Sequence, residues 1–326
     1  MGKRFLHSVA LPTVDLVAST NNTGFDLPVN PLSAILLRFQ VTNVAPAAIL
    51  TYSAIDDIIT QMTGVRVLHK GEQIVSGNLR DLMVLNAVYQ HAYPGWAGLD
   101  NVDDAVRSVV FPICLGKRMY DPDSCFPATS RGNLRLEIDT GADGAAYDDI
   151  NWSVETIELI ESTPREYLKY VRQARDSVAG QFDAALPIGN PLLGILLFDT
   201  GIATLSTEAT SWGTVKVLKD NIEQYYPLSD FETIAGMLKT QMGATHAIIA
   251  GHQHLTSEGG GAELISDDME QRISTGDRGY AYLDFDPLRD GSYEMETAGA
   301  ADLKIRGQGD AAAAIRYYPI ERVMVK

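Results

Sequence analysis

The sequence contains only two cysteines, Cys114 and Cys125, among 326 residues. Two cysteines are too few for the disulfide framework that stabilises many secreted domains, and their spacing matches no metal or redox motif. We therefore expect the chain to be made in a reducing cytoplasm.

Long hydrophobic runs are also missing, since no apolar stretch approaches the roughly 20 residues of a membrane-spanning helix. Hydrophobic residues make up 45% and charged residues 21% of the chain, as in an ordinary globular protein. The segment from Met1 to Leu16 begins with a basic tip, but Pro12 and Asp15 interrupt its apolar run before a signal-peptide core can form. We interpret this segment as a first strand.

Positive charge is scarce: 26 Lys and Arg stand against 42 Asp and Glu, which gives a net charge of −16. This balance excludes a protein that binds nucleic acid over its whole surface by neutralising phosphates, and we expect no sequence-specific contact with nucleic acid. The acidity favours solubility at high concentration.

Catalytic signatures are absent as well. The sequence has no Gly-x-Ser-x-Gly elbow and no pair of Cys-x-x-Cys motifs, and the triplet Gly259 to Gly261 lacks the lysine of a phosphate-binding loop. We therefore do not expect an enzyme or a bound cofactor.

What the sequence does contain is an internal repeat that spans about half of the chain. The run Asn-Pro-Leu at Asn30 to Leu32 returns at Asn190 to Leu192, each time followed by an apolar segment. Two further pairs of segments keep the same order, and a duplicated chain indicates two similar domains rather than one large one. These pairs are Val65–His69 with Val215–Lys219, and Gly132–Leu136 with Ala301–Ile305.

The remaining pattern consists of short apolar or β-branched runs separated by Gly, Pro, Asn and Asp. This pattern predicts an all-β protein built from antiparallel sandwiches. We expect strands at 8–16, 32–43, 65–68, 106–113, 133–138 and 152–161 in the first half, and at 192–197, 213–219, 246–251, 280–285, 302–306 and 315–325 in the second.

A few helices are predicted between the strands. Ser229 and Glu232 form a capping box ahead of an apolar face, and Asn78 caps an equivalent helix that reaches about Gln90 in the first half. A further short helix is expected over Ser53 to Met62. Pro164 and Glu166 follow Thr163 in the pattern of a helix start, so we predict a connecting helix at 164–180 between an N-terminal domain at 1–163 and a C-terminal domain at 181–326.

Two tandem eight-stranded sandwiches with a helix in one connection of each resemble the double jelly-roll major capsid proteins of tailless icosahedral viruses. This lineage includes membrane-containing phages and the adenovirus hexon. The resemblance rests on the repeated Asn-Pro-Leu run, on the Val-(Arg/Lys)-Val-Leu strand with its following helix, and on the paired closing strands of each copy.

The resemblance implies a structural role. Three chains would form a trimer whose six jelly rolls make a pseudo-hexameric capsomer, and many trimers would tile the icosahedral shell of a virion. The chain would then be made in the cytoplasm of the host, a bacterium if the virus is a bacteriophage. Its partners would be other copies of itself and minor capsid or penton proteins, and the basic tip Met1 to Phe5 could face an internal membrane or the genome.

A bicupin-like metalloenzyme is the alternative. His252 and His254 would lie on one face of a strand, and Glu258 could complete a metal site. However, the position six residues before the first histidine is His246 rather than the glycine of cupins, and no second motif supplies a distal histidine. A solvent-facing loop explains the same residues.

Asp284 and Asp286 form a second weak candidate for a metal site. Their alternation allows both carboxylates to share one sheet face and bind calcium, and it equally fits solvated positions opposite buried Leu283 and Phe285. A carbohydrate-binding or spike protein made of two β-sandwiches is a third interpretation, but it does not require the matched helices.

Overall fold

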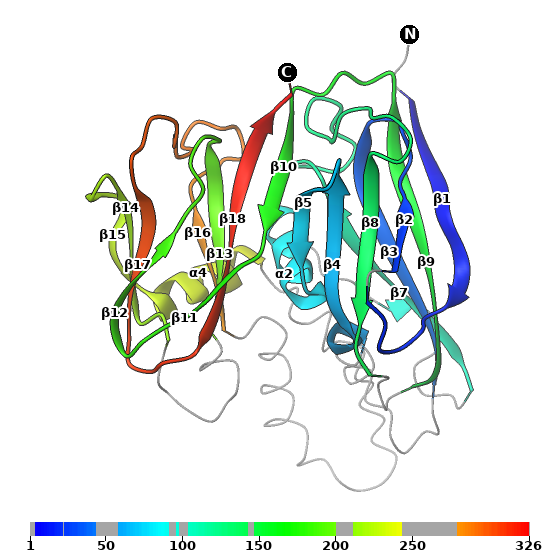
Figure 1. The fold of residues 1–326 in the computed structure, drawn as a ribbon, viewed down its shortest axis with the longest axis horizontal. Coiled ribbons are helices and arrows are strands. Elements are labelled where there is room, and N and C mark those ends of the chain that lie inside the picture. Colours follow the sequence, from blue (N-terminus) through cyan, green and yellow to red (C-terminus); the bar gives the residue numbers. More distant parts are fainter. Residues whose placement is uncertain are drawn as a thin grey trace, which may run out of the picture. The chain divides into compact units, whose positions relative to one another are not determined.

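The computed structural model describes residues 4–21, 23–43, 58–90, 96–97, 104–142, 147–199, 211–242 and 279–325. The chain divides into two compact units (Figure 1). Unit 1 contains the described residues up to Arg165, and unit 2 runs from Glu166 to Gln241 and from Asp277 onward. Each unit is dominated by strands, as the sequence pattern predicts.

Unit 1 has two antiparallel sheets. One has the strand order β1-β9-β3-β7-β6 and the other has the order β5-β4-β8-β2. The strands are β1 (Arg4–Asp15), β2 (Thr23–Asp26), β3 (Leu32–Asn43), β4 (Met62–His69), β5 (Glu72–Gly77), β6 (Trp96–Ala97), β7 (Val106–Cys114), β8 (Leu134–Thr140) and β9 (Tyr147–Ile160).

Unit 2 repeats this plan. One sheet has the order β16-β13-β18-β10, with β11 also paired to β18, and the other has the order β12-β17-β14-β15. The strands are β10 (Glu166–Val171), β11 (Gln173–Asp176), β12 (Gly180–Ala185), β13 (Leu192–Phe198), β14 (Thr214–Lys219), β15 (Ile222–Asp230), β16 (Tyr280–Asp284), β17 (Leu303–Gly309) and β18 (Ala314–Met324).

Apart from β6 and β11, the strands of the two units correspond one to one, and the correspondence extends to register. In unit 1, β3 pairs with β9 so that Leu32 lies opposite Glu158, followed by a bulge at the next residue. In unit 2, β13 pairs with β18 so that Leu192 lies opposite Glu321, with a bulge at the same place. Identical irregularities at corresponding positions show that the sequence repeat is a structural repeat.

The second repeated segment forms the same hairpin in each unit. Strands β4 and β5 turn through Lys70 and Gly71, and strands β14 and β15 turn through Asp220 and Asn221. All four turn residues have positive φ angles, between 53° and 86°, as a two-residue type I′ turn requires. The two turns use different residue types. Gly tolerates this conformation freely, whereas Asp and Asn adopt it through their short polar side chains.

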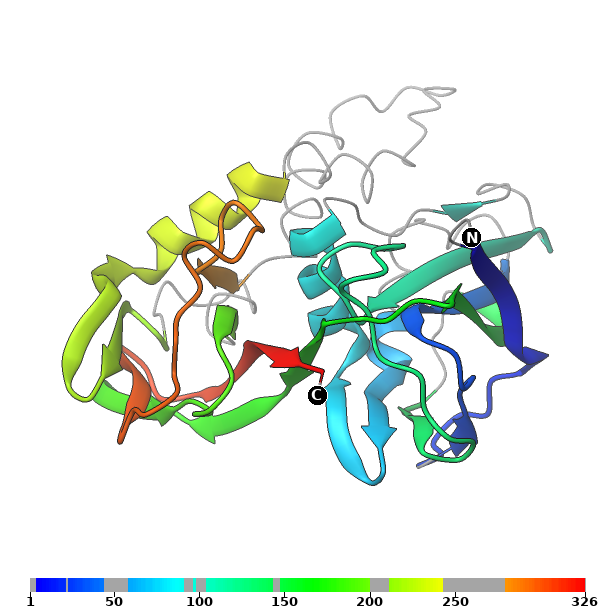
Figure 2. The same ribbon diagram turned by 90° about the horizontal axis from the view of Figure 1, so that it is seen from above.

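Each hairpin is followed by a helix of twelve residues, α2 (Leu79–Gln90) in unit 1 and α4 (Phe231–Met242) in unit 2 (Figure 2). Asn78 caps α2 as predicted, since its Oδ1 accepts from the backbone N–H of Asp81 at 2.8 Å. Strand β15 continues to Asp230, so Asp230 rather than Ser229 precedes the first residue of α4. Of the short helix expected before β4, residues 58–61 are described and helical.

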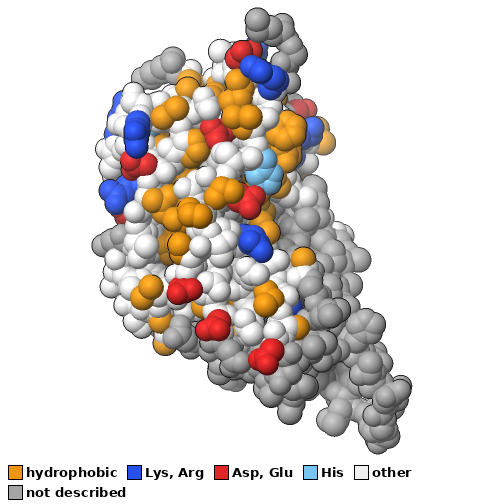
Figure 3. Space-filling view, turned by 90° about the vertical axis from the view of Figure 1, so that its right-hand side faces the viewer, with side chains coloured by type: hydrophobic (Ala, Val, Ile, Leu, Met, Phe, Trp, Pro, Cys, Tyr) orange, Lys and Arg blue, Asp and Glu red, His pale blue; other side chains and the backbone are white. Residues whose placement is uncertain are grey.

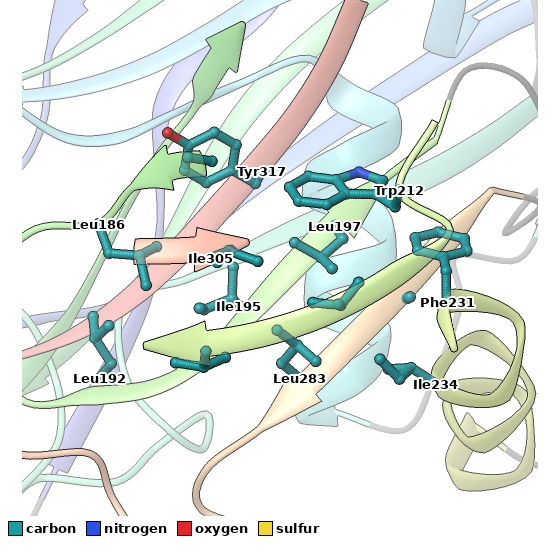
Figure 4. Close-up of a cluster of buried hydrophobic side chains, with 14 of the residues drawn as sticks. Leu186, Leu192, Ile195, Leu197, Trp212, Phe231, Ile234, Leu283, Ile305 and Tyr317 are labelled. Atoms are coloured by element: carbon teal, nitrogen blue, oxygen red, sulfur yellow. The ribbon is translucent and has the colours of Figure 1, made fainter. Parts of the chain in front are cut away.

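The core of unit 2 lies between its two sheets and α4 (Figure 4). Trp212 is fully buried at its centre, where its indole N–H donates to the carbonyl of Phe198 at 3.1 Å. Phe231 and Ile234 reach the same cluster from α4, which confirms the apolar face predicted for that helix. Burial of this kind of surface is the main favourable term in folding.

The connecting helix predicted at 164–180 is wrong. Residues Glu166–Val171 form β10 and Gln173–Asp176 form β11, and both strands pair with β18. Leu168 and Tyr170 are buried while their neighbours are not, which is the period of a strand. Pairing with a distant segment overrode the local helix-start pattern.

The strand expected at 246–251 lies outside the described residues. Within the described ranges, the helices are too short or too polar to cross a membrane.

Candidate functional site

The predicted metal residues are placed only in part. His252, His254 and Glu258 lie outside the described residues, whereas Asp284 ends β16 and Asp286 begins the turn that follows it. In the described part of the chain, no three His, Cys, Asp or Glu side chains come close enough to hold a metal ion.

Asp284 and Asp286 are not the solvated residues that alternation suggested. Asp284 forms an ion pair with Arg289 at 3.0 Å, and Asp286 is fully buried with its Oδ1 accepting from the N–H of Gly291 at 2.8 Å. Burial raises the pKa of Asp284 above its ordinary value, although Arg289 acts in the opposite direction. These two carboxylates therefore shape the turn after β16.

The repeated Asn-Pro-Leu run performs a definite structural task in unit 1. Asn30 Nδ2 donates to Glu158 Oε2 at 2.7 Å, and the carbonyl of Pro31 accepts from the N–H of Leu159 at 2.8 Å. Glu158 is only 4% exposed, and its Oε1 accepts from the hydroxyl of Ser8 in β1 at 2.5 Å. A buried carboxylate needs such donors because an unpaired one is very costly. We call this arrangement the first joint.

Unit 2 builds the same joint from the second copy of the run. Asn190 Nδ2 donates to Glu321 Oε2 at 2.8 Å, and the carbonyl of Pro191 accepts from the N–H of Arg322 at 2.9 Å. Glu321 is 8% exposed. The second joint therefore ties the start of β13 to the last strand, as the first joint ties the start of β3 to β9.

The surfaces of the two units differ most at two edge strands. In β1, every side chain is exposed or half-buried, and Phe5, Val9 and Val14 are among the exposed ones. Figure 3 shows hydrophobic side chains gathered on the face of the molecule that carries this strand. In unit 2, the edge strand β15 has no buried side chain either, and Ile222 and Leu228 are 66% and 60% exposed.

A hollow of about 280 Å³ opens beside β1, where the two sheets of unit 1 part between β1 and β2. Two bulges in the pairing of β1 with β9 lie along it. The apolar lining includes Leu11, Val14, Phe25 and Trp152. The lining also includes the polar residues Asp15, Thr20 and Thr140.

Comparison with known proteins identifies the architecture. No protein-family model and no curated protein matches the sequence. Among solved structures, the major capsid protein of bacteriophage PM2 is 14% identical with a TM-score of 0.59, covering 100% of this chain and 98% of that one. This chain is a double jelly roll.

Structures from other viruses share this double jelly roll. A chain of Sulfolobus turreted icosahedral virus is 12% identical with a TM-score of 0.65, covering 98% of this chain and 91% of that one. The Faustovirus major capsid protein is 8% identical with a TM-score of 0.56, with coverages of 99% and 90%. The fold predicted from the repeat is thereby confirmed, while the count of eight strands in each roll stays a prediction.

Sequence reasoning identified the Asn-Pro-Leu run of the double jelly roll but missed its partners. Glu158 and Glu321 stand in strands, where a glutamate is ordinarily exposed. The available signal was the repeat itself, because both copies place a glutamate at the same position of the last strand.

Proposed function

We propose that this chain is a major capsid protein that self-assembles as pseudo-hexameric trimers, and that these trimers tile the icosahedral shell of a virus. The observation that carries the proposal is the double jelly roll over the whole chain, shared end to end with viral major capsid proteins. The role needs no chemistry at a reaction centre, so we propose a protein that is not an enzyme.

The surfaces of the chain support assembly. A jelly roll buries the inner faces of its own sheets and leaves its edge strands and loops available for lateral contacts. Here β1 and β15 leave several large apolar side chains exposed at sheet edges. Proteins with exposed apolar edges of this length generally cover them in an assembly.

The proposal extends to place and partners. The protein would be synthesised in the host cytoplasm and function in the virion, where copies of itself and minor capsid or penton proteins surround it. The contact with an internal membrane or the genome would be made by residues 1–3 of the basic tip, which lie outside the described residues. The N-terminal roll would occupy 1–163, and the C-terminal roll of 181–326 would also include β10 and β11, which form where a connecting helix was expected at 164–180.

Native mass spectrometry tests the proposal directly. A metal-free species with three times the 35.5 kDa mass of the chain is expected, and electron microscopy of concentrated samples should show hexagonal capsomers. A monomer with one transition-metal ion per chain would instead support the bicupin-like alternative, with His252, His254 and Glu258 as ligands. The comparisons give that alternative no support.

A further inference from the structure

Corresponding strands of the two rolls differ in burial in a complementary way. The first strand of unit 1, β1, has no buried residue, whereas its counterpart in unit 2, β10, buries Leu168 and Tyr170. The second hairpin strand shows the reverse. Strand β5 of unit 1 buries Ile74 and Val75, whereas its counterpart β15 in unit 2 buries nothing.

We propose that β1 of one chain packs against β15 of a second copy, head to tail, and that this contact joins neighbouring chains in the assembly. The inference rests on the proposed function and names the surfaces that it uses. Each of the two bare strands is the counterpart of a strand that is covered in the other roll. A second copy of this chain therefore provides the strand that covers each of these two edges.

Such a contact allows a closed ring. Two different surfaces of one chain meet, so the contact is heterologous, and a heterologous contact yields either a ring or an open filament. In a ring of three chains, every β1 and every β15 is covered once. No exposed edge of this kind remains to recruit a fourth chain.

Charge complementarity supports the same pairing. Arg4 lies at the start of β1 with its side chain 72% exposed, at 3.7 Å from the carboxylate of Glu161 in the same chain. On the other side, Asp230 of β15 and Glu232 of α4 are exposed acidic residues, whereas Glu223 of β15 is paired with Lys216 at 2.9 Å. Opposite charges at the rim of an apolar contact contribute register and specificity more than affinity.

The contact should be made by side chains rather than by a continuous backbone ladder. Strand β1 contains Pro12 and two bulges, and β15 contains Pro227 in an irregular stretch of its own, between the paired residues Gln224 and Ser229. Proline has no N–H to donate, and bulges twist an edge away from an incoming strand. The apolar side chains of Phe5, Val9 and Leu228 remain available on the two edges.

Crosslinking of mixed cysteine variants tests the inference. Purified full-length Val9→Cys and Leu228→Cys chains are mixed, allowed to exchange, and treated with a flexible bismaleimide. We expect a covalent dimer in the mixture and none in either variant alone. The native thiols give no background, because Cys114 and Cys125 are buried and burial raises the pKa of each to about 12.

A chain that carries both substitutions should crosslink to a product of three chains and stop there, as a closed ring requires. Dimers from Val9→Cys alone would mean that β1 meets β1, which overturns the inference. Trimers of the unmodified chain without any crosslink would overturn it too, while leaving the proposed function intact. An unmodified chain that stays monomeric and forms no capsomers would defeat both.

Point substitutions give a second measurement. Val9→Asp and Leu228→Asp should each reduce the trimer at least about tenfold at equal concentration, because a charge is forced into an apolar contact. Val106→Asp in unit 1 and Val178→Asp in unit 2 are matched controls at similarly exposed apolar side chains, since Val106 begins β7 and Val178 precedes β12, at the opposite edge of its sheet from β15. Equal losses in the controls would contradict a contact specific to β1 and β15.

Discussion

Asn30 and Asn190 hold buried glutamates, and this makes each asparagine more important than its partial exposure suggests. Replacing either with alanine removes a donor and leaves a carboxylate oxygen buried without it. We expect Asn30→Ala or Asn190→Ala to lower the free energy of unfolding of its own unit by about 1–3 kcal/mol. Chemical denaturation followed by fluorescence measures the change.

The exposed Gln181 in β12 provides the control for this pair. Gln181→Ala should change the free energy of unfolding by less than about 0.5 kcal/mol, as surface substitutions usually do. A loss at Asn30 or Asn190 no larger than at Gln181 would show that the joints do not stabilise the rolls.

Asp183 gives unit 2 a specific response to acid. Arg306 donates to both of its carboxylate oxygens, at 2.7 Å and 2.9 Å, and this pairing lowers the pKa of Asp183 below its ordinary value. The folded state therefore favours the ionised form. The resulting stabilisation is complete above the ordinary pKa of about 3.9 and is lost as pH falls through the lower folded value.

Unfolding curves between pH 6 and pH 2 should show this loss in the unmodified chain and a smaller one in Asp183→Asn. The effect is modest because the carboxylate is 37% exposed and solvent screens the pair. Asp176→Asn, at an exposed carboxylate of β11, is the matched control. Identical acid dependence in all three proteins would assign the response to other groups.

At the scale of single elements, two glycines differ in whether the structure leaves space for a side chain. Gly194 lies in β13, where an added Cβ would clash with the ring of Tyr282 and come within 2.7 Å of the carbonyl oxygen of Leu283. Gly236 lies in α4 with no atom within 4 Å of an added Cβ. We expect Gly194→Ala to destabilise unit 2 by roughly 1–3 kcal/mol and Gly236→Ala to stabilise it by about 1 kcal/mol.

Thermal unfolding of the two variants under one set of conditions shows whether each substitution raises or lowers the stability of unit 2. The first copy makes the comparison sharper, since Ala34 occupies the position of Gly194 in β3 and is buried there without difficulty. A stabilising effect of Gly194→Ala would mean that Tyr282 moves aside at little cost.

The elements also show how far sequence reasoning extends. The repeated segments were predicted well, because Leu32 to Asn43 combines an apolar pattern with β-branched residues and lies where β3 is found. The helix at 164–180 was wrong, because the Thr-Pro-x-Glu pattern records only local preference. What made β10 and β11 strands was pairing with β18, roughly 140 to 160 residues further along the chain, which local propensity does not contain.

For the whole molecule, the negative net charge opposes assembly. Each chain carries a net charge of −16, so copies repel one another at low ionic strength. Apolar edges attract regardless of salt, and screening shortens the range of repulsion to about 8 Å at 0.15 M salt. We expect the fraction of trimer in the proposed assembly to rise between 0.02 M and 0.5 M sodium chloride.

Light scattering at fixed protein concentration measures that fraction. A fall with salt would indicate an interface dominated by ion pairs, in conflict with apolar contacts through β1 and β15. The Val178→Asp variant, which adds one negative charge beside β12 at the opposite sheet edge from β15, should show the same trend.

The two joints also bear on the order in which a growing chain can fold. Asn30 and Glu158 are 128 residues apart, and Asn190 and Glu321 are 131 residues apart. Each joint can thus form only when nearly all of its roll has left the ribosome. The first joint can form while the second roll is still being translated. Vectorial synthesis in this way engages Glu158 before Glu321 exists. This order prevents an asparagine of one roll from pairing with the glutamate of the other, although the two joints are nearly identical.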